Sequence, residues 1–307
     1  MKRLMVCAIT ALSAVAPATP ASATGCTRLP GRHTLPVVFQ GQQYPVDVYI
    51  PAGVRPGARL PAVVNLHGTQ STGANQLEYS NMKQARHFVL APTGVIPAGA
   101  GYGWNVPGAG TPPAGARDDV AFLDRVISTA VTALCADPAR VYGTGYSGGG
   151  RMISAYACAR PEMIAAIAPV AGLRAGRPDP GDNAKPDPSS CTPGRPVPVL
   201  TFHGDQDWTN PFAGGGSVYW GYSVPAALTR WAEINRCAPR PRTTEVTDQI
   251  SKITYGSCRR GAEVTLYRIA NGGHTWPGTP VDNGNGTVTH EIDANQLMSR
   301  FFQRHRR

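Results

Sequence analysis

The chain has 307 residues and a formal net charge of +10, from 29 Lys and Arg against 19 Asp and Glu. Hydrophobic residues make up 42%, which is enough for a core, while 35 Gly and 29 Pro predict many loops. This composition excludes a coiled coil, a collagen-like fibre and a disordered chain. The length suits one large α/β domain or two small ones.

The first 23 residues have the pattern of a secretory signal peptide. Lys2 and Arg3 precede an apolar stretch of mostly small residues, and Ala21-Ser22-Ala23 is a cleavage site of the A-x-A type. The stretch is too short to cross a bilayer, and no later segment is long and apolar enough to do so. We therefore expect a secreted protein, with one mature domain over residues 24–307 and no membrane span.

Seven cysteines are present, and Cys7 belongs to the signal segment. The six that remain predict three disulfides in an exported chain. We predict the pairs Cys237–Cys258, Cys158–Cys191 and Cys26–Cys135, although six cysteines allow 15 pairings. No Cys or His spacing is typical of a zinc site, so no metal is expected.

Cys26 has an alternative role as a lipid-carrying N-terminus, because the residues before it faintly resemble a lipobox. The usual Leu three places before the Cys is replaced by Ala23. Lipidation would also leave an odd number of cysteines for pairing. Both points favour free secretion over a lipid anchor.

The positive charge does not indicate a nucleic-acid partner. Of the basic residues 25 are Arg, and they are scattered apart from the run Arg304-His305-Arg306-Arg307. Nucleic-acid binders usually carry a basic stripe or an aromatic-basic module. We expect instead a basic secreted surface, which would favour acidic polysaccharide or cell wall.

Strands and helices are predicted to alternate along the chain. A β-hairpin of residues 33–39 and 44–50 turns at Gly41. Further strands are predicted at 61–67, 87–92, 140–144, 163–170, 197–202 and 264–269. Helices are predicted at 118–134, 151–159, 224–235 and 296–304. This alternation is typical of a mostly parallel sheet with helices on both faces, in a single α/β domain.

The segment Gly145-Tyr146-Ser147-Gly148-Gly149 matches G-x-S-x-G between a predicted strand and a predicted helix. This setting is that of a nucleophile elbow, in which the serine hydroxyl is lifted clear of the sheet. Glycine permits the sharp turn, and N–H groups at the start of the helix face the developing oxyanion. We therefore predict that Ser147 is a nucleophile; the alternative is a structural Gly-rich turn.

A serine nucleophile needs a base, and three histidines follow it late in the chain: His274, His290 and His305. His274 comes directly after the strand 264–269, at the strand end where such sheets place their sites. His290 lies in a polar turn region and His305 in the tail. We predict His274 as the general base.

The acid that orients the base is expected in the loop after the strand 197–202. Asp207 is the predicted acid and Asp205 the alternative; either residue could also be a solvated turn aspartate. The oxyanion hole needs two backbone donors, which we predict to be the N–H groups of Gly148 and Thr69. His67, which precedes that second loop, is predicted to be structural.

These motifs together resemble the secreted polyhydroxybutyrate depolymerase/feruloyl esterase group of the α/β-hydrolases, related to carbohydrate esterase family 1. The resemblance covers about residues 60–278 and rests on Leu66–Gln70, Trp104-Asn105, Asp118–Val120, Gly145–Gly149, His203–Asp207, Trp231–Cys237 and Gly273–Gly278. It implies the α/β-hydrolase fold and a triad of Ser147, Asp207 and His274. One departure is that many relatives carry Cys after the His-Gly pair, where this chain has Thr69.

Aromatic residues gather in the loops predicted near the site. The candidates for substrate binding are Trp104, Tyr146, Trp208, Trp220 and Trp276, joined by Tyr102 and Tyr219. Such rings suit a planar acyl group or a sugar; ordinary loop packing is the alternative. Trp231 is assigned to the core. After Gly278 only 29 residues remain, fewer than a polymer-binding domain needs, so short esters are expected as substrates.

The sequence thus predicts a secreted serine carboxylesterase that needs no metal and no organic cofactor. The expected substrates are feruloyl or acetyl esters of plant polysaccharide, or hydroxyalkanoate esters. An acyltransferase on the same scaffold and a non-catalytic wall- or polysaccharide-binding protein are the alternatives. A complete triad argues against the binding protein, because binding alone does not require all three residues.

Overall fold

The computed structural model describes residues 29–55, 57–84, 86–217 and 219–307. Ten of its strands form one sheet in the order β1-β2-β4-β3-β7-β8-β9-β12-β11-β10. In chain order these are β1 (Gly31–Phe39), β2 (Gln42–Ile50), β3 (Leu60–Leu66), β4 (Phe88–Ala91), β7 (Ala136–Tyr146), β8 (Ala166–Val170), β9 (Val199–Gly204), β10 (Arg242–Thr247), β11 (Ile250–Tyr255) and β12 (Val264–Ile269). The central strands from β4 to β12 are parallel, and the outer strands at both ends are antiparallel.

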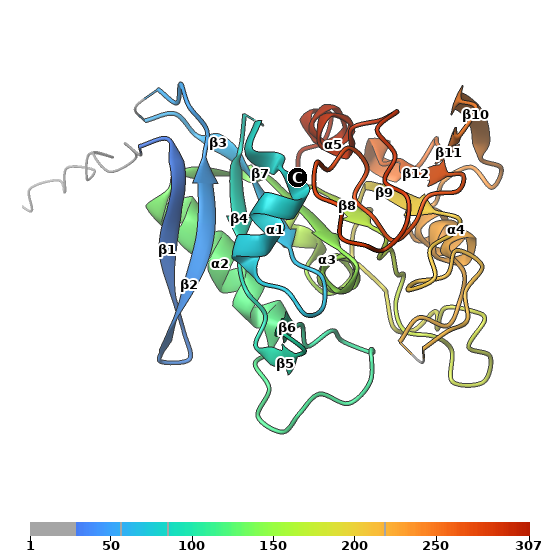
Figure 1. Ribbon diagram of the computed structural model, residues 1–307, viewed down its shortest axis with the longest axis horizontal. Coiled ribbons are helices and arrows are strands. Elements are labelled where there is room, and N and C mark those ends of the chain that lie inside the picture. Colours follow the sequence, from blue (N-terminus) through green and yellow to red (C-terminus); the bar gives the residue numbers. More distant parts are fainter. Residues whose placement is uncertain (1–28, 56, 85, 218) are drawn as a thin grey trace, which may run out of the picture.

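Figure 1 shows the sheet extending from β1 and β2 at one end to β10 and β11 at the other. The helices are α1 (Gly73–Ser80), α2 (Asp119–Ala133), α3 (Gly148–Ala159), α4 (Val224–Ile234) and α5 (Ala294–Gln303). Successive residues of β3 point to opposite faces, so Val64 packs in one core cluster with α2, α3 and α4, whereas Val63 packs in another with α1 and α5. The predicted mostly parallel sheet with helices on both faces is therefore confirmed.

Local signals explain where the predicted helices begin. The side chain of Asp118 accepts a hydrogen bond from the Ala121 N–H and caps α2, and Ser223 caps α4 in the same way through Ala226. Trp231 of α4 is fully buried in the core, as predicted. The strand predicted at 163–170 is shorter in the structure, because a 3₁₀ turn occupies Pro161–Met163 and β8 begins only at Ala166.

Five elements were not predicted from the sequence, namely helix α1, strands β10 and β11, and the two strands of a small hairpin. Helix α1 is short, and its apolar residues do not form a stripe, so the helical period is not visible. Strand β10 is an almost fully exposed edge strand without alternation of polar and apolar residues. The small hairpin of β5 (Ile96–Ala98) and β6 (Gly101–Gly103) lies within a segment rich in Gly, Pro and Ala, residues 93–115, whose composition is typical of a loop.

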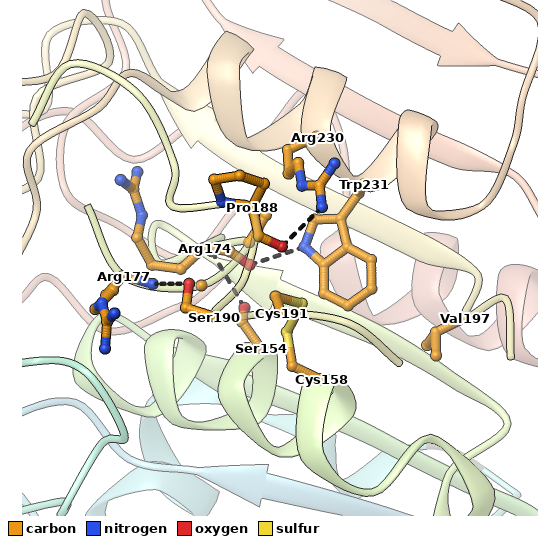
Figure 2. The surroundings of a disulfide bond; sticks show 12 residues. Ser154, Cys158, Arg174, Arg177, Pro188, Ser190, Cys191, Val197, Arg230 and Trp231 are labelled. Carbon is orange, nitrogen blue, oxygen red and sulfur yellow. Dashed lines mark hydrogen bonds between the residues drawn. A yellow bond between two sulfur atoms is a disulfide. The ribbon is translucent and has the colours of Figure 1, made fainter. Parts of the chain in front are cut away.

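Two predicted disulfides are present, Cys158–Cys191 and Cys237–Cys258. Figure 2 shows the first of them joining α3 to the loop that follows β8, close to Trp231 of α4. Cys135 is also disulfide-bonded. Its predicted partner Cys26 and the signal segment 1–23 lie outside the described residues, so the pair Cys26–Cys135 stays a prediction. In the part of the chain that the structure describes, no helix is long and apolar enough to span a membrane.

Candidate active site

Ser147 stands at the sharp turn between β7 and α3. Its backbone has φ 53° and ψ −113°, a conformation that is uncommon for a residue with a side chain and is typical of strained functional positions. The Ser147 N–H donates to the carbonyl of Val170 on β8, which holds the turn against the sheet. The neighbouring glycines are required by space: a Cβ on Gly149 would lie 2.2 Å from the carbonyl oxygen of Leu66.

His274 and Asp207 meet at the carboxyl ends of two adjacent parallel strands. Asp207 follows β9 and His274 follows β12, and these strands pair in parallel from Val264↔Val199 to Ile269↔Gly204. Parallel strands place their carboxyl ends at the same edge of the sheet. His274 Nδ1 and Asp207 Oδ2 are 2.7 Å apart, and only 3% of each residue is exposed. Asp207 Oδ1 accepts two further bonds from the N–H groups of Thr209 and Asn210.

The alternatives to these two residues have other partners. Asp205 pairs with Arg268 at 3.0 Å and accepts the N–H of Asn271, so it orients the loop rather than the imidazole of His274. His305 follows α5 and lies 3.5 Å from Glu263, and His290 is exposed. Of the candidates, the structure therefore brings together Asp207 and His274.

The electrostatic state of the pair suits a general base. Burial lowers the pKa of His274, and this effect outweighs the hydrogen bond and the charge of Asp207. Burial raises the pKa of Asp207, but the hydrogen bonds from His203 and His274 outweigh it and hold the pKa well below its usual range. At neutral pH the histidine is therefore neutral and the aspartate ionised. With Nδ1–H donating to Asp207, Nε2 of His274 carries the lone pair that can accept a proton.

His203 is a contact of Asp207 that sequence reasoning missed. Its Nε2 lies 3.2 Å from Asp207 Oδ2 and 2.8 Å from the carbonyl oxygen of Asn210, and its side chain is buried. Both neighbours are acceptors, so Nε2 carries a proton and donates. The only signal in the sequence was its place four residues before Asp207, at the end of a buried strand.

The predicted oxyanion donors lie side by side. A Cβ placed on Gly148 would be 3.1 Å from the backbone nitrogen of Thr69, and a Cβ on Gly68 would be 3.5 Å from Cβ of Ser147. The loop after β3 therefore passes directly over the start of α3. This close approach is possible because neither glycine has a side chain.

His67 holds this loop, as its predicted structural role requires. Its Nε2 accepts the N–H of Gly94, so Nδ1 carries the proton and donates to the carbonyl of Gly68 at 2.7 Å. Burial lowers the pKa of His67 to about 4, which keeps the ring neutral. Trp104 packs against the His67 ring, with centroids 4.8 Å apart and ring planes tilted by 35°, and its Nε1–H donates to the His67 carbonyl. Trp104 thus supports the loop that follows β3.

A cavity of about 330 Å³ opens beside the oxyanion loop. Its lining includes Gly68, Thr69, Tyr79, Tyr146 and Asn283. The hydroxyl of Tyr146 donates to the carbonyl of His274, and Asn283 donates to both tyrosine hydroxyls. The wall of this cavity is therefore tied to the loop that carries His274.

Three of the five aromatic residues predicted to bind substrate are misplaced for that role. Trp104 is only 7% exposed, and its ring packs against His67. Trp220 and Trp276 are fully buried, with 0% exposure, so they pack in the protein interior and offer no surface to a ligand. The loop positions suggested proximity to the site, but the large apolar rings are covered by neighbouring chain. Tyr146 lines the cavity, and Trp208 is 62% exposed on the loop that carries Asp207.

Comparison with known proteins finds esterases that are similar to the chain in sequence. Feruloyl esterase B of Piromyces equi is 29% identical over 240 residues, covering 75% of this chain and 42% of that protein. The putative esterase NocK of Nocardia uniformis subsp. tsuyamanensis is 27% identical over 240 residues, covering 71% and 66%. The chain thus spans about two fifths to two thirds of the length of these relatives. No protein-family model matches it.

The fold is also that of solved esterases. The acetyl xylan esterase from Aspergillus awamori aligns with a TM-score of 0.57 and 16% sequence identity, over 84% of this chain and 93% of that one. At this identity the likeness concerns the fold alone. The chain therefore has the α/β-hydrolase fold.

Proposed function

We propose that this protein is a serine carboxylic-ester hydrolase that acts through an acyl-enzyme. The observation that carries the proposal is the 2.7 Å hydrogen bond between His274 and Asp207 at the sheet edge where Ser147 stands on a positive-φ turn. The order Ser, Asp, His along the chain is that of α/β-hydrolase triads. The esterase names of the relatives support the same reading.

In the first half of the reaction, Ser147 Oγ attacks the ester carbonyl and His274 Nε2 takes its proton. The N–H groups of Gly148 and Thr69 stabilise the resulting oxyanion, each supplying roughly 3 kcal/mol. When the tetrahedral intermediate collapses, the C–O bond to the alcohol breaks and His274 returns the proton to the leaving oxygen. Asp207 stabilises the imidazolium throughout.

In the second half, a water molecule attacks the acyl-enzyme, with His274 again taking the proton. The acid is released and Ser147 regains its hydrogen. The depressed pKa of His274 keeps the base neutral and ready at each turnover. Apart from this water, the nucleophile, the base, the acid and the oxyanion donors are groups of the chain itself.

For the substrate, we propose feruloyl or acetyl esters of plant polysaccharide, with hydroxyalkanoate esters as the second class. The cavity of about 330 Å³ exceeds the needs of an acetyl group and has two tyrosine rings, Tyr79 and Tyr146, for an aromatic acyl chain. Trp208, which is exposed next to Asp207, offers a face for a sugar ring of the alcohol. The similarity to feruloyl esterase B of Piromyces equi favours the feruloyl class.

We propose in addition that the protein is secreted. The signal pattern of residues 1–23 and the two disulfides of the described chain support this, since disulfides persist in oxidising compartments. Sequencing the N-terminus of protein recovered from culture medium tests it. A mature chain that starts at Thr24 is the expected result.

The activity is tested with wild type and Ser147→Ala on three substrates: methyl ferulate, acetylated xylan and hydroxybutyrate oligomers. We expect hydrolysis by the wild type of at least one, and none by the variant. Labelling by a fluorophosphonate, located on Ser147 by peptide mapping, separates an enzyme from a binding protein. A folded wild type that takes up no label would refute the proposal. Product analysis with an acceptor sugar distinguishes hydrolysis from acyl transfer.

A further inference from the structure

Arg151 is a buried cation without a carboxylate partner among the described residues. It lies on α3, four residues after Ser147, and is 8% exposed. Its guanidinium stacks over the ring of Tyr219 at 4.0 Å, and its Nε has no hydrogen-bond partner. Burying an unpaired charge is costly, so such a group persists only where surrounding structure or function compensates for it.

The position of the Arg151 guanidinium further increases the free-energy cost of burying its charge. A long side chain on a helix points back toward the N-terminus, where the helix dipole is already positive. A Cβ placed on Gly148 would lie 3.4 Å from Nη2 of Arg151, which locates the guanidinium beside the predicted oxyanion donor. Burial lowers the pKa of a second arginine, Arg174, and the charge of Arg151 nearby lowers it further. Positive potential thus accumulates where negative charge would develop in the reaction.

Thr69 connects this cation to the oxyanion site. Arg151 Nη2 donates to Thr69 Oγ1 at 3.5 Å, a long contact for a hydrogen bond. The methyl group of Thr69 faces Gly103, because a Cβ there would lie 3.7 Å from Cγ2. The hydroxyl faces Gly148, because a Cβ there would lie 2.5 Å from Oγ1. The side chain is therefore oriented with its hydroxyl toward the oxyanion donors.

The chemistry of the two groups determines where the hydroxyl hydrogen points. Arginine only donates hydrogen bonds, so toward Arg151 the threonine oxygen acts as the acceptor. Its own hydrogen is then free for another acceptor. Thr69 is exposed and lines the cavity beside Ser147, so that acceptor can be a group of the substrate.

We propose that the Thr69 hydroxyl is a third oxyanion donor, and that Arg151 is a positioning residue that holds it in the donating orientation. This inference rests on the proposed esterase function and assigns the Thr69 side chain a role beyond that of its backbone N–H. Arg151 acts on the oxyanion through the Thr69 hydroxyl. It does not touch the reacting atoms.

The first test compares Thr69→Val with Thr69→Ser. Valine keeps the shape and the backbone N–H and removes only the hydroxyl, whereas serine keeps the hydroxyl. We expect kcat for an ester that the wild type cleaves to fall about 100-fold in Thr69→Val, with KM little changed, because removal of one oxyanion donor typically costs this much. Thr69→Ser is expected to stay within about threefold of wild type. Loss of less than threefold in Thr69→Val overturns the proposal.

The second test removes the cation with Arg151→Met and uses Arg125→Met as the matched control, because Arg125 is an exposed arginine on α2. We expect Arg151→Met to lower kcat about tenfold or more, and Arg151→Lys to recover part of it. The double variant Thr69→Val/Arg151→Met is expected to be no worse than Thr69→Val alone within about threefold, since both act through one hydroxyl. Fully additive losses would overturn the positioning role.

The pH dependence of kcat/KM is a third test, because a merely structural role of Arg151 would not change it. Burial is the main cause that lowers the pKa of His274; of the charged and titratable groups that act on it, Asp207 raises this pKa, and His203 and Arg151 lower it further. Removal of Arg151 therefore shifts the acidic limb of kcat/KM to higher pH, while Arg125→Met leaves the limb in place. An unshifted limb in a folded Arg151→Met variant counts against the proposal.

The rate of inactivation by a fluorophosphonate keeps this inference separate from the proposed function. The adduct carries an oxygen in the oxyanion site, so its formation depends on the same donors. A wild type that takes up no label contradicts the esterase proposal itself. A wild type that is labelled at the same rate as Thr69→Val contradicts only the third donor. If Arg151→Met does not fold, the pair of Thr69 variants decides.

Discussion

The substitution Gly148→Ala is expected to disturb the oxyanion hole while it leaves the stability of the fold almost unchanged. The new Cβ would lie 2.5 Å from Thr69 Oγ1 and 3.1 Å from Thr69 N. The first distance is too short for any real contact, so the threonine side chain must rotate. The second forces the backbone N–H to move by a few tenths of an ångström. Both groups that we assign to the oxyanion on that side are displaced by one methyl group.

The expected loss of kcat follows from the transition-state stabilisation that each oxyanion donor supplies. Displacing one donor typically lowers kcat by about 100- to 1,000-fold, corresponding to roughly 3–4 kcal/mol. The helix itself tolerates the change, because Gly148 has no positive φ and alanine favours a helix over glycine by about 1 kcal/mol. We therefore expect a protein that melts within a few degrees of wild type and is almost inactive.

The assay is kcat/KM for a p-nitrophenyl acyl ester, with the rate of fluorophosphonate inactivation and the Tm measured on the same preparations. Gly194→Ala is the matched control, because a Cβ at Gly194 meets nothing within 4 Å. It should match wild type in all three measurements. A Gly148→Ala variant with wild-type Tm and kcat/KM within threefold of wild type would refute the placement of the oxyanion hole.

Three further predictions concern the triad and the stability of the fold. Asp207→Asn should lower kcat in steady-state assays by about 10⁴-fold, because the orientation of the His274 imidazole is lost. Asp205→Asn loses only a surface ion pair, so its kcat should stay within tenfold of wild type. Equal losses in the two variants would contradict the assignment of Asp207 as the acid. Burial lowers the pKa of both His67 and His87 to about 4, so on acidification the unfolded chain takes up protons first and stability falls between about pH 6.5 and 4. Each contributes up to about 3 kcal/mol, and His87→Leu should flatten urea-unfolding free energy against pH; an unchanged slope would argue against a neutral His87. Replacing Cys158 and Cys191 by Ala opens a loop with a sequence separation of 33 residues and should cost about 4 kcal/mol in urea unfolding, while a loss below 1 kcal/mol would show that the bridge does not restrain the unfolded chain.

Much of the architecture follows from local sequence patterns. The apolar runs at β3 and β12 and the capped, striped helices α2 and α4 carry their period in a short window, so their type and approximate bounds could be predicted. The same holds for the turn at Ser147, where the spacing of glycines between a strand and a helix is itself the signal. The edge strand β10 carries no such pattern because almost all of its residues are exposed. The short helix α1 carries none because, of its buried residues, only Leu77 has a large apolar side chain.

Which site residues could be predicted from the sequence depended on their order in the chain and on their position in loops after strands. Ser147 and His274 each stand directly after a recognisable strand, and the parallel sheet brings those strand ends to one edge. The sequence left Asp207 and Asp205 as alternatives, two residues apart in one loop. Only the structure separates them, because it aims one carboxylate at His274 and the other at Arg268.

The burial of an aromatic side chain could not be predicted from its position in a loop. Trp208 and Trp220 are both aromatic residues of the same region, yet one is 62% exposed and the other fully buried. Their burial depends on which distant segments cover them, and no local pattern records this. Arg151 was missed for the same reason, since its contact is with Thr69, far from it in the chain. His203 was missed because its contact with Asp207, although close in sequence, depends on the conformation of the loop.

The sequence by itself therefore determined the α/β architecture, the nucleophile turn and the candidate base, because these depend on periodicity and on residues close together in the chain. The tertiary structure decided which acid meets the base, which aromatic rings stay open to a ligand, and how Arg151 approaches Thr69 across 82 positions of sequence. These are contacts between segments whose distance in space is set by the packing of the whole sheet and its helices. They arise only when the chain has folded.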